Sequence, residues 1–228
     1  MNKKIRVTIL DDHQSIIDGY LFRLSKTPQI EVAATIHFGD ELEPLLENTQ
    51  TDVLLLDIGV RTAPDNPTPY PIHYLIPRLL DRYPKLEILV ISMYADRGLV
   101  TAMMEVGASG YIIKDDQAAI RDLGNIIISI AGGGVYLSQK AHQHFLKNHM
   151  QKTRDILTLR QLEALSLYAA YPDYSTTAIA EKMSVSNSTI RNLLAGAYVR
   201  LGVNNRTAAI AKARELGIIA PDSEPWLA

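Results

Sequence analysis

The sequence contains no cysteine, which excludes disulfide bonds and cysteine-based metal sites. It also has little near its start that could enter a membrane, because the apolar run after the charged N-terminus is about six residues long and is broken by Arg6. Such a run is too short for a signal peptide or a membrane span. We therefore expect a cytoplasmic protein with no membrane partner.

The small net charge of −2 conceals an asymmetry between the two halves of the 228-residue chain. Residues 1–130 carry 12 Lys and Arg against 18 Asp and Glu, whereas residues 131–228 carry 11 against 7. An apolar content of 47% is enough for one or two domains with proper cores. The charges fit a metal and phosphate site in the first half and a polyanionic partner for the second.

Polar side chains follow four strand-like apolar runs in the first half. Asp11 and Asp12 follow the first run, Asp57 the second, Ser92 the third and Lys114 the fourth. If these runs form a parallel sheet, their carboxyl ends meet at one rim, where open α/β sheets bind ligands. A single Asp or Ser after a strand is more often a turn or a helix cap. Four such positions in order instead favour a shared site.

Clustered carboxylates repel one another, and a hard cation that prefers oxygen ligands, typically Mg²⁺, relieves this repulsion. We therefore expect Asp11, Asp12 and Asp57 to hold Mg²⁺. Asp57 would also be the nucleophile, because an aspartate can accept a phosphoryl group as an acyl phosphate. Lys114 would pair with one phosphoryl oxygen and Ser92 would donate a hydrogen bond to another.

The second half has a helical pattern from Leu157 onward. The pattern predicts two amphipathic helices, a short turn, an N-cap at Ser186 and a third helix with an apolar inner face. Such an arrangement is typical of helix-turn-helix reading of the DNA major groove. A solvated surface helix is the alternative on pattern alone. The residues expected to contact DNA are Asn187, Ser188, Thr189, Arg191, Asn192 and Ala195.

The first half resembles the receiver domain of two-component response regulators. The motifs that carry the likeness are LDDH at 10–13, LLLD at 54–57, ISMY at 91–94 and GASGYIIKD at 107–115. The resemblance implies that Asp57 accepts phosphate from a sensor histidine kinase and that the backbone carbonyl of Gly59 joins the Mg²⁺ ligands. It also implies that Tyr111 is an aromatic switch. A half-buried strand tyrosine is the alternative for that position.

The second half resembles a LuxR-type helix-turn-helix domain. Its motifs are LTLRQLEAL at 157–165, STTAIAEKMSVSNSTIRN at 175–192 and RLGVNNRTAAIAKARELGII at 200–219. Together the halves resemble the NarL/FixJ class. This implies a flavodoxin-like, doubly wound receiver with a five-stranded parallel sheet over 1–130, a linker over 131–154, an all-α helix-turn-helix domain over 155–220 and a tail over 221–228.

One segment departs from the receiver pattern. The chain from Val60 to His73 contains four prolines and is about seven residues longer than the usual loop. Proline at this density is incompatible with a regular helix or a central strand, so we expect an extended loop. The loop could alter partner choice or dephosphorylation rate, or it could be a tolerated insertion.

These patterns predict a phosphorylation-controlled transcription factor, not an enzyme, that binds promoter DNA as a homodimer. One alternative is a DNA-binding protein controlled by a partner or a small ligand through the proline-rich loop. A second is an aspartate-nucleophile phosphatase. Such enzymes usually have another aspartate two residues after the nucleophile, where this chain has Gly59.

Overall fold

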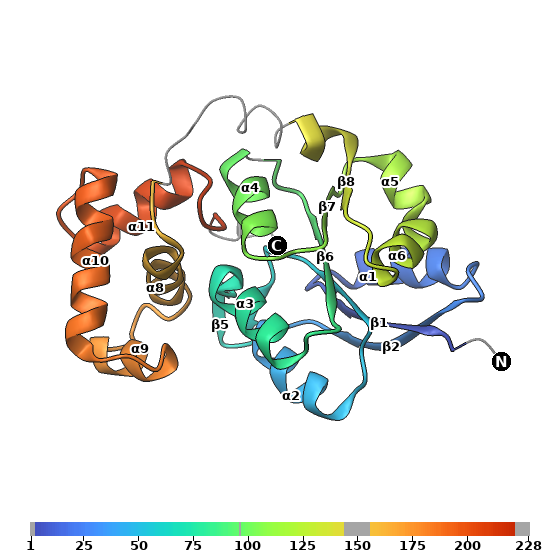
Figure 1. Ribbon diagram of the computed structural model, residues 1–228, viewed down its shortest axis with the longest axis horizontal. Coiled ribbons are helices and arrows are strands. Elements are labelled where there is room, and N and C mark those ends of the chain that lie inside the picture. The colour runs from blue at the N-terminus through green and yellow to red at the C-terminus, as the bar shows by residue number, and fades with distance from the viewer. Residues whose placement is uncertain (1–2, 96, 144–155, 222–228) are drawn as a thin grey trace.

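The computed structural model describes residues 3–95, 97–143 and 156–221, which form an α/β unit and a smaller helical unit beside it (Figure 1). Residues 144–154 of the predicted linker and the tail from residue 222 lie outside the described residues. The α/β unit contains the rim that the sequence predicts. The helical unit contains the predicted DNA-binding helix.

The α/β unit is built on a parallel sheet with the strand order β2-β1-β3-β6-β7-β8. Its central strands are buried on both faces, as their continuous apolar sequences require. The strands are β1 (Ile5–Leu10), β2 (Ile30–Ile36), β3 (Val53–Leu56), β6 (Glu87–Ser92), β7 (Gly110–Ile113) and β8 (Tyr136–Leu137).

Helices cover both faces of this sheet, and each face has its own apolar core (Figure 1). One face packs against α1 (Gln14–Leu24), α5 (Gln117–Arg121) and α6 (Leu123–Ala131). The other packs against α2 (Leu42–Asn48), α3 (Ile72–Arg82) and α4 (Arg97–Glu105), with a 3-10 turn at Gly39–Glu41 before α2. The doubly wound receiver fold is therefore confirmed.

The sheet has six strands, where the sequence predicted five. Helix α6 ends at Gly132, and Gly133 takes a left-handed conformation with φ of 84° that turns the chain back toward β7. Tyr136 and Leu137, which fall in the predicted linker, then pair with Gly110 and Tyr111. A strand of two residues is too short to give a recognisable periodicity.

The proline-rich segment contains an antiparallel hairpin, where the sequence predicted an extended loop. Strands β4 (Arg61–Ala63) and β5 (Asn66–Pro69) pair with each other and form a sheet of their own. Pro67 and Pro69 fit in β5 because a strand with one neighbour leaves half of its backbone amides unused. Helix α3 then begins at Ile72, inside the predicted loop.

The helical unit contains α8 (Leu159–Ala170), α9 (Thr176–Lys182), α10 (Asn187–Leu201) and α11 (Arg206–Glu215). Side chains cap all four N-termini, and the predicted cap at Ser186 accepts a hydrogen bond from the amide of Thr189 at 3.1 Å. Helix α10 ends at Gly202, whose φ of 68° is left-handed. The predicted helix-turn-helix architecture is confirmed.

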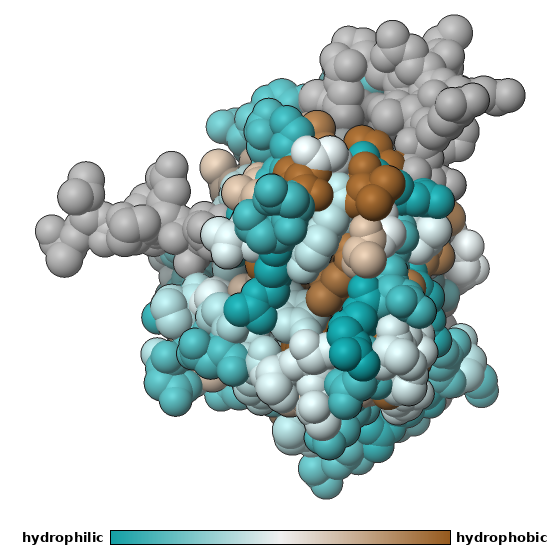
Figure 2. Space-filling view, turned by 90° about the vertical axis from the view of Figure 1, so that its left-hand side faces the viewer, coloured by the Kyte–Doolittle hydropathy of each residue, from teal (hydrophilic) through white to brown (hydrophobic). Residues whose placement is uncertain are grey.

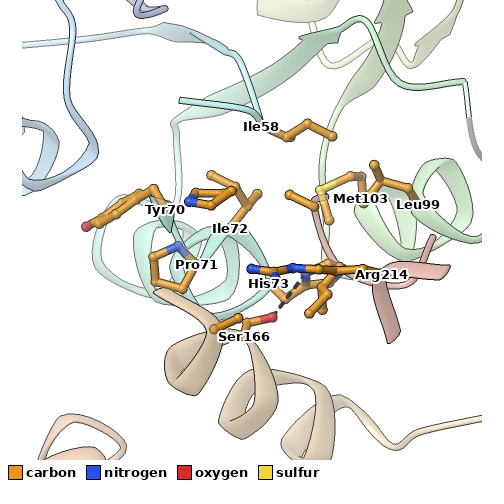
Figure 3. A pocket seen from close by; sticks show the side chains of 13 residues that line it. Ile58, Tyr70, Pro71, Ile72, His73, Leu99, Met103, Ser166 and Arg214 are labelled. Carbon is orange, nitrogen blue, oxygen red and sulfur yellow. Dashed lines mark hydrogen bonds between the residues drawn. The ribbon is translucent and has the colours of Figure 1, made fainter. Parts of the chain in front are cut away.

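The two units pack through α3 and α8. His73 of α3 lies 3.4 Å from the hydroxyl of Ser166 in α8, and both border a cavity of about 20 Å³ that Arg214 of α11 also lines (Figure 3). Nearby, Tyr74 donates a hydrogen bond to the carbonyl of Lys182, and Tyr171 donates one to Asp40 at 3.0 Å. The helical unit therefore rests on the receiver through apolar packing and a few polar contacts.

We expect stability to fall below neutral pH because of His73. Burial lowers the pKa of His73 to about 3, below its ordinary 6.5. Between these two pKa values the unfolded chain binds more protons at His73 than the folded chain does. The free energy of unfolding therefore has its full value above about pH 6.5 and decreases as the pH falls below it. Between about pH 7 and about pH 5 this loss is about 2 kcal/mol.

Urea unfolding across this pH range tests the expectation. His73→Gln should lack the His73 contribution to the slope, while the same change at exposed His142 should leave the slope unchanged. Equal slopes in wild type and His73→Gln would contradict the assignment.

Candidate functional site

The predicted polar residues meet at the carboxyl edge of the sheet. Asp11 and Asp12 follow β1, Asp57 follows β3, Ser92 ends β6 and Lys114 follows β7. Adjacent strands β1, β3, β6 and β7 carry them, so residues more than 100 positions apart in the chain become neighbours. Asp11, Asp57 and Ser92 are all buried.

Lys114 holds two of the carboxylates together. Its Nζ lies 2.6 Å from Oδ2 of Asp11 and 2.9 Å from Oδ2 of Asp57, and its side chain is 7% exposed. Burial raises the pKa of Asp57, with a further contribution from Asp11 and an opposing one from Lys114. Burial alone would lower the pKa of Lys114, but the two carboxylates outweigh it and the pKa is raised. The site therefore contains a buried cation between two buried anions.

The acidic cluster has the donor set of a hard cation. One ligand atom from each of Asp11, Asp12, His13 and Asp57 lies within 4.8 Å of the others. Oδ1 of Asp12 is buried and accepts no hydrogen bond from the described residues, although Nδ1 of His13 lies 2.7 Å from it. Oxygen atoms placed this way fit a divalent cation such as Mg²⁺. Gly59 borders the site, since its amide donates to Oδ1 of Asp57 at 3.2 Å.

Ser92 and Tyr111 both contact the backbone of Tyr94. The hydroxyl of Ser92 accepts a hydrogen bond from the Tyr94 amide at 3.1 Å, and the fully buried Tyr111 donates one to the Tyr94 carbonyl at 2.7 Å. The Tyr94 ring also approaches Gly59, since a Cβ built on Gly59 would lie 3.5 Å from it. Asp57 is therefore connected to the segment before α4 through Gly59 and the Tyr94 ring.

Two residues of this rim were not predicted as site residues. His13 directly follows the predicted aspartates, so its sequence position already suggested proximity. Arg61, the first residue of β4, brings its Nε to 3.4 Å from Oδ2 of Asp12 and places its guanidinium 5.1 Å from the centre of the Phe38 ring. Nothing in the sequence indicated this contact, because it depends on the fold of the hairpin.

The predicted DNA-contact residues lie together on the outer side of α10. Their side chains are exposed, while Ile190, Leu194, Ala197 and Leu201 face the core. Figure 2 views the molecule from the side of the helical unit, where hydrophilic and weakly polar residues dominate around a short apolar strip. The exposed residues are Asn187, Ser188, Thr189, Arg191, Asn192 and Ala195.

Comparison with known proteins agrees with both halves of this architecture. The family described as bacterial regulatory proteins, luxR family, matches residues 155–213. The transcriptional regulatory protein DegU of Brevibacillus brevis is 29% identical over 240 residues, which cover 94% of each chain. Over most of its length the chain is therefore similar to response regulators of the NarL/FixJ class.

Other relatives of the regulator extend over most of its length. The oxygen regulatory protein NreC of Staphylococcus aureus strain JH9 is 27% identical over 212 residues, covering 89% of the regulator and 93% of NreC. The structure of RcsB from Salmonella enterica serovar Typhimurium, bound to promoter rprA with the phosphomimetic BeF3⁻, has 22% identity and a TM-score of 0.65. It covers 92% of the regulator and 98% of that chain, so the two proteins share their fold. Within the described residues, no helix is both long and apolar enough for a membrane crossing.

We expect Lys114→Met to destabilise the metal-free regulator by about 3 kcal/mol, because the substitution leaves buried carboxylates without their cation. The measurement is urea unfolding in the presence of a chelator. Lys140→Met is the matched control, since Lys140 and Asp115 form a pair that is about half exposed on both sides and should contribute less than about 1 kcal/mol. Similar losses in the two variants would argue against a stabilising role for buried Lys114.

Proposed function

We propose that the regulator is a transcription factor controlled by phosphorylation of Asp57 and active on promoter DNA as a dimer. The observation that carries this proposal is Lys114 between Asp11 and Asp57, beside a buried Asp12 oxygen that a cation could use. A nucleophilic carboxylate, a metal-binding pair and a cation for the incoming phosphoryl oxygens thereby lie at one rim. The donor would be a phosphohistidine of a sensor kinase.

In the reaction, an Asp57 oxygen forms the new P–O bond while the P–N bond of the phosphohistidine breaks and the electron pair leaves with the imidazole. Lys114 pairs with one phosphoryl oxygen as the charge arrives. Ser92 turns from the Tyr94 amide to donate to another. Asp11, Asp12, Asp57 and the Gly59 carbonyl would hold Mg²⁺, which would supply positive charge that offsets the clustered anions.

Phosphorylation would act on Tyr94 and Tyr111 next. If Ser92 leaves the Tyr94 amide, the segment before α4 loses one of its hydrogen bonds, and the bond from Tyr111 to the Tyr94 carbonyl is another. The resulting shift would favour a receiver state that dimerises and presents two helical units to spaced half-sites. RcsB has been solved as dimers bound to DNA, which supports the dimeric part of this proposal.

The proposed division of labour follows the predicted domains. Residues 1–130 together with β8 would form the unit that accepts the phosphoryl group, the residues from β8 to 154 would connect the units, residues 155–220 would bind DNA, and residues 221–228 would form a tail. The class consists of transcriptional regulators, and Gly59 stands where the phosphatases usually carry their second aspartate. Both points favour a switch over a turnover enzyme.

We expect Mg²⁺ with beryllofluoride, a phosphoryl mimic, to convert wild-type monomers to dimers, and Asp57→Asn to abolish the conversion. The neutral amide removes the charge that coordinates the mimic. Light scattering gives the molar mass directly. Asp115→Asn is the control, because Asp115 also follows a strand of the sheet, β7, but is exposed and pairs with Lys140. Dimerisation of Asp57→Asn, or none in wild type with beryllofluoride bound, would refute this form of the switch.

We expect Arg191→Ala to weaken binding to duplex DNA and to reduce the slope of log affinity against log salt by about 1, since one phosphate contact is lost. Fluorescence anisotropy at several salt concentrations measures both quantities. Lys85→Ala removes an exposed receiver cation and should change neither. If Arg191→Ala changed neither the DNA affinity nor its salt dependence, Arg191 on the outer face of α10 would not contact phosphate.

A further inference from the structure

The β4–β5 hairpin is held together by its own hydrogen bonds. The hydroxyl of Thr62 donates to the Thr68 carbonyl at 2.8 Å, and the amide of Tyr70 donates to the Val60 carbonyl at 3.0 Å. Oδ1 of Asn66 accepts a hydrogen bond from the amide of Thr68. Pro67 and Pro69 further restrict the backbone. The hairpin can therefore transmit a displacement from one strand to the other.

The first strand of the hairpin reaches the acidic cluster. Arg61 lies beside Asp12, with Nε 3.4 Å from Oδ2, and its guanidinium stacks over Phe38. Among the described residues, Lys114 pairs with Asp11 and Asp57, whereas Arg61 is the arginine or lysine that pairs with Asp12. The other oxygen of Asp12, Oδ1, accepts no hydrogen bond from the described residues and lies 2.7 Å from Nδ1 of His13.

The second strand reaches the DNA-binding unit. Asn66 donates from Nδ2 to the carbonyl of Ala170 at 3.0 Å, and the hydroxyl of Thr68 donates to the same oxygen. Ala170 is the last residue of α8, where backbone carbonyls lack partners within the helix. Two side chains of the hairpin thus donate hydrogen bonds from the receiver to this end of α8. The hairpin contacts α8 on the same face of the receiver as α3 (Figure 1).

A divalent cation and Arg61 cannot both pair well with Asp12. The two positive charges would lie within a few ångströms of each other, and repulsion at this distance disfavours simultaneous occupancy. Because Arg61 belongs to the hairpin, its departure from Asp12 also disturbs the strand that contacts Ala170. Two ligands that compete in this way are linked thermodynamically, and each must weaken the other equally.

We propose that Arg61 is an additional positioning residue of the phosphoryl-acceptor site, which holds Asp12 in place of the divalent cation and so sets metal binding against docking of the hairpin on α8. The inference rests on the proposed function, because it assumes that Asp12 is a metal ligand. It assigns a role to the proline-rich insertion. The insertion lowers the affinity of the unphosphorylated site for the metal. When the metal binds, the contacts between the hairpin and the end of α8 weaken.

The test is calorimetric titration of the full-length, unphosphorylated regulator with Mg²⁺. Arg61→Gln removes the positive charge and leaves a polar side chain, and it should tighten Mg²⁺ binding about two- to fivefold. The double variant Asn66→Ala/Thr68→Val removes both donors to Ala170 without touching the acidic cluster, and it should also tighten binding. Asp65→Asn changes an exposed residue between the two strands and should have no effect.

Amide hydrogen exchange provides the reciprocal readout. Mg²⁺ should speed exchange at the amides of Tyr70 and Tyr171 in wild type, whose hydrogen bonds lie at the hairpin and at the end of α8. In Arg61→Gln the effect of Mg²⁺ on these amides should be lost, because the competition is gone.

The outcomes separate the two hypotheses. Absence of Mg²⁺ binding in wild type and in every variant would overturn the metal site and with it the proposed function. Binding in wild type that Arg61→Gln leaves unchanged or weakens would overturn the role of Arg61 alone. If Arg61→Gln bound Mg²⁺ more tightly but the double variant did not, Arg61 would act only through its charge at the acidic cluster. That result would overturn the link to α8.

Discussion

The carboxylates at the end of β1 and β3 can be buried together because Lys114 lies between them. Asp11 and Asp57 would otherwise repel each other in an environment that solvates charge poorly. The parallel sheet supplies the geometry, since β7 brings Lys114 to the same edge from more than 50 residues beyond Asp57. Every other feature of the site, from the Ser92 and Tyr111 contacts to Arg61, surrounds this arrangement of three charges.

The acidic site and the predicted DNA-contact face of α10 lie in different units, so control of one by the other would need a physical connection. The packing of α3 against α8 is one such connection, and in it buried His73 contacts Ser166. The hairpin is a second connection, because Arg61 lies at the acidic cluster and Asn66 at the end of α8. The helical unit therefore contacts an element that begins only four residues after Asp57.

Much of this architecture was predictable from short-range patterns. Apolar runs that end in Asp57 or Lys114 indicate strands of a buried parallel sheet, and Ser186 with its helical spacing indicates the start of α10. Two errors have physical causes. β8 is too short to give a periodicity, and the hairpin is encoded by a proline-rich sequence because paired strands at an edge tolerate residues that central strands exclude.

The sequence by itself determined the residue types at the rim, the class of fold and the outer face of α10, because each depends on periodicity or on a residue's place at the end of an element. Only the tertiary structure decided that Arg61 meets Asp12, that Asn66 meets Ala170 and that His73 is buried. These contacts join residues up to 104 positions apart. They depend on how the hairpin and α3 pack against α8, and no local pattern encodes that packing.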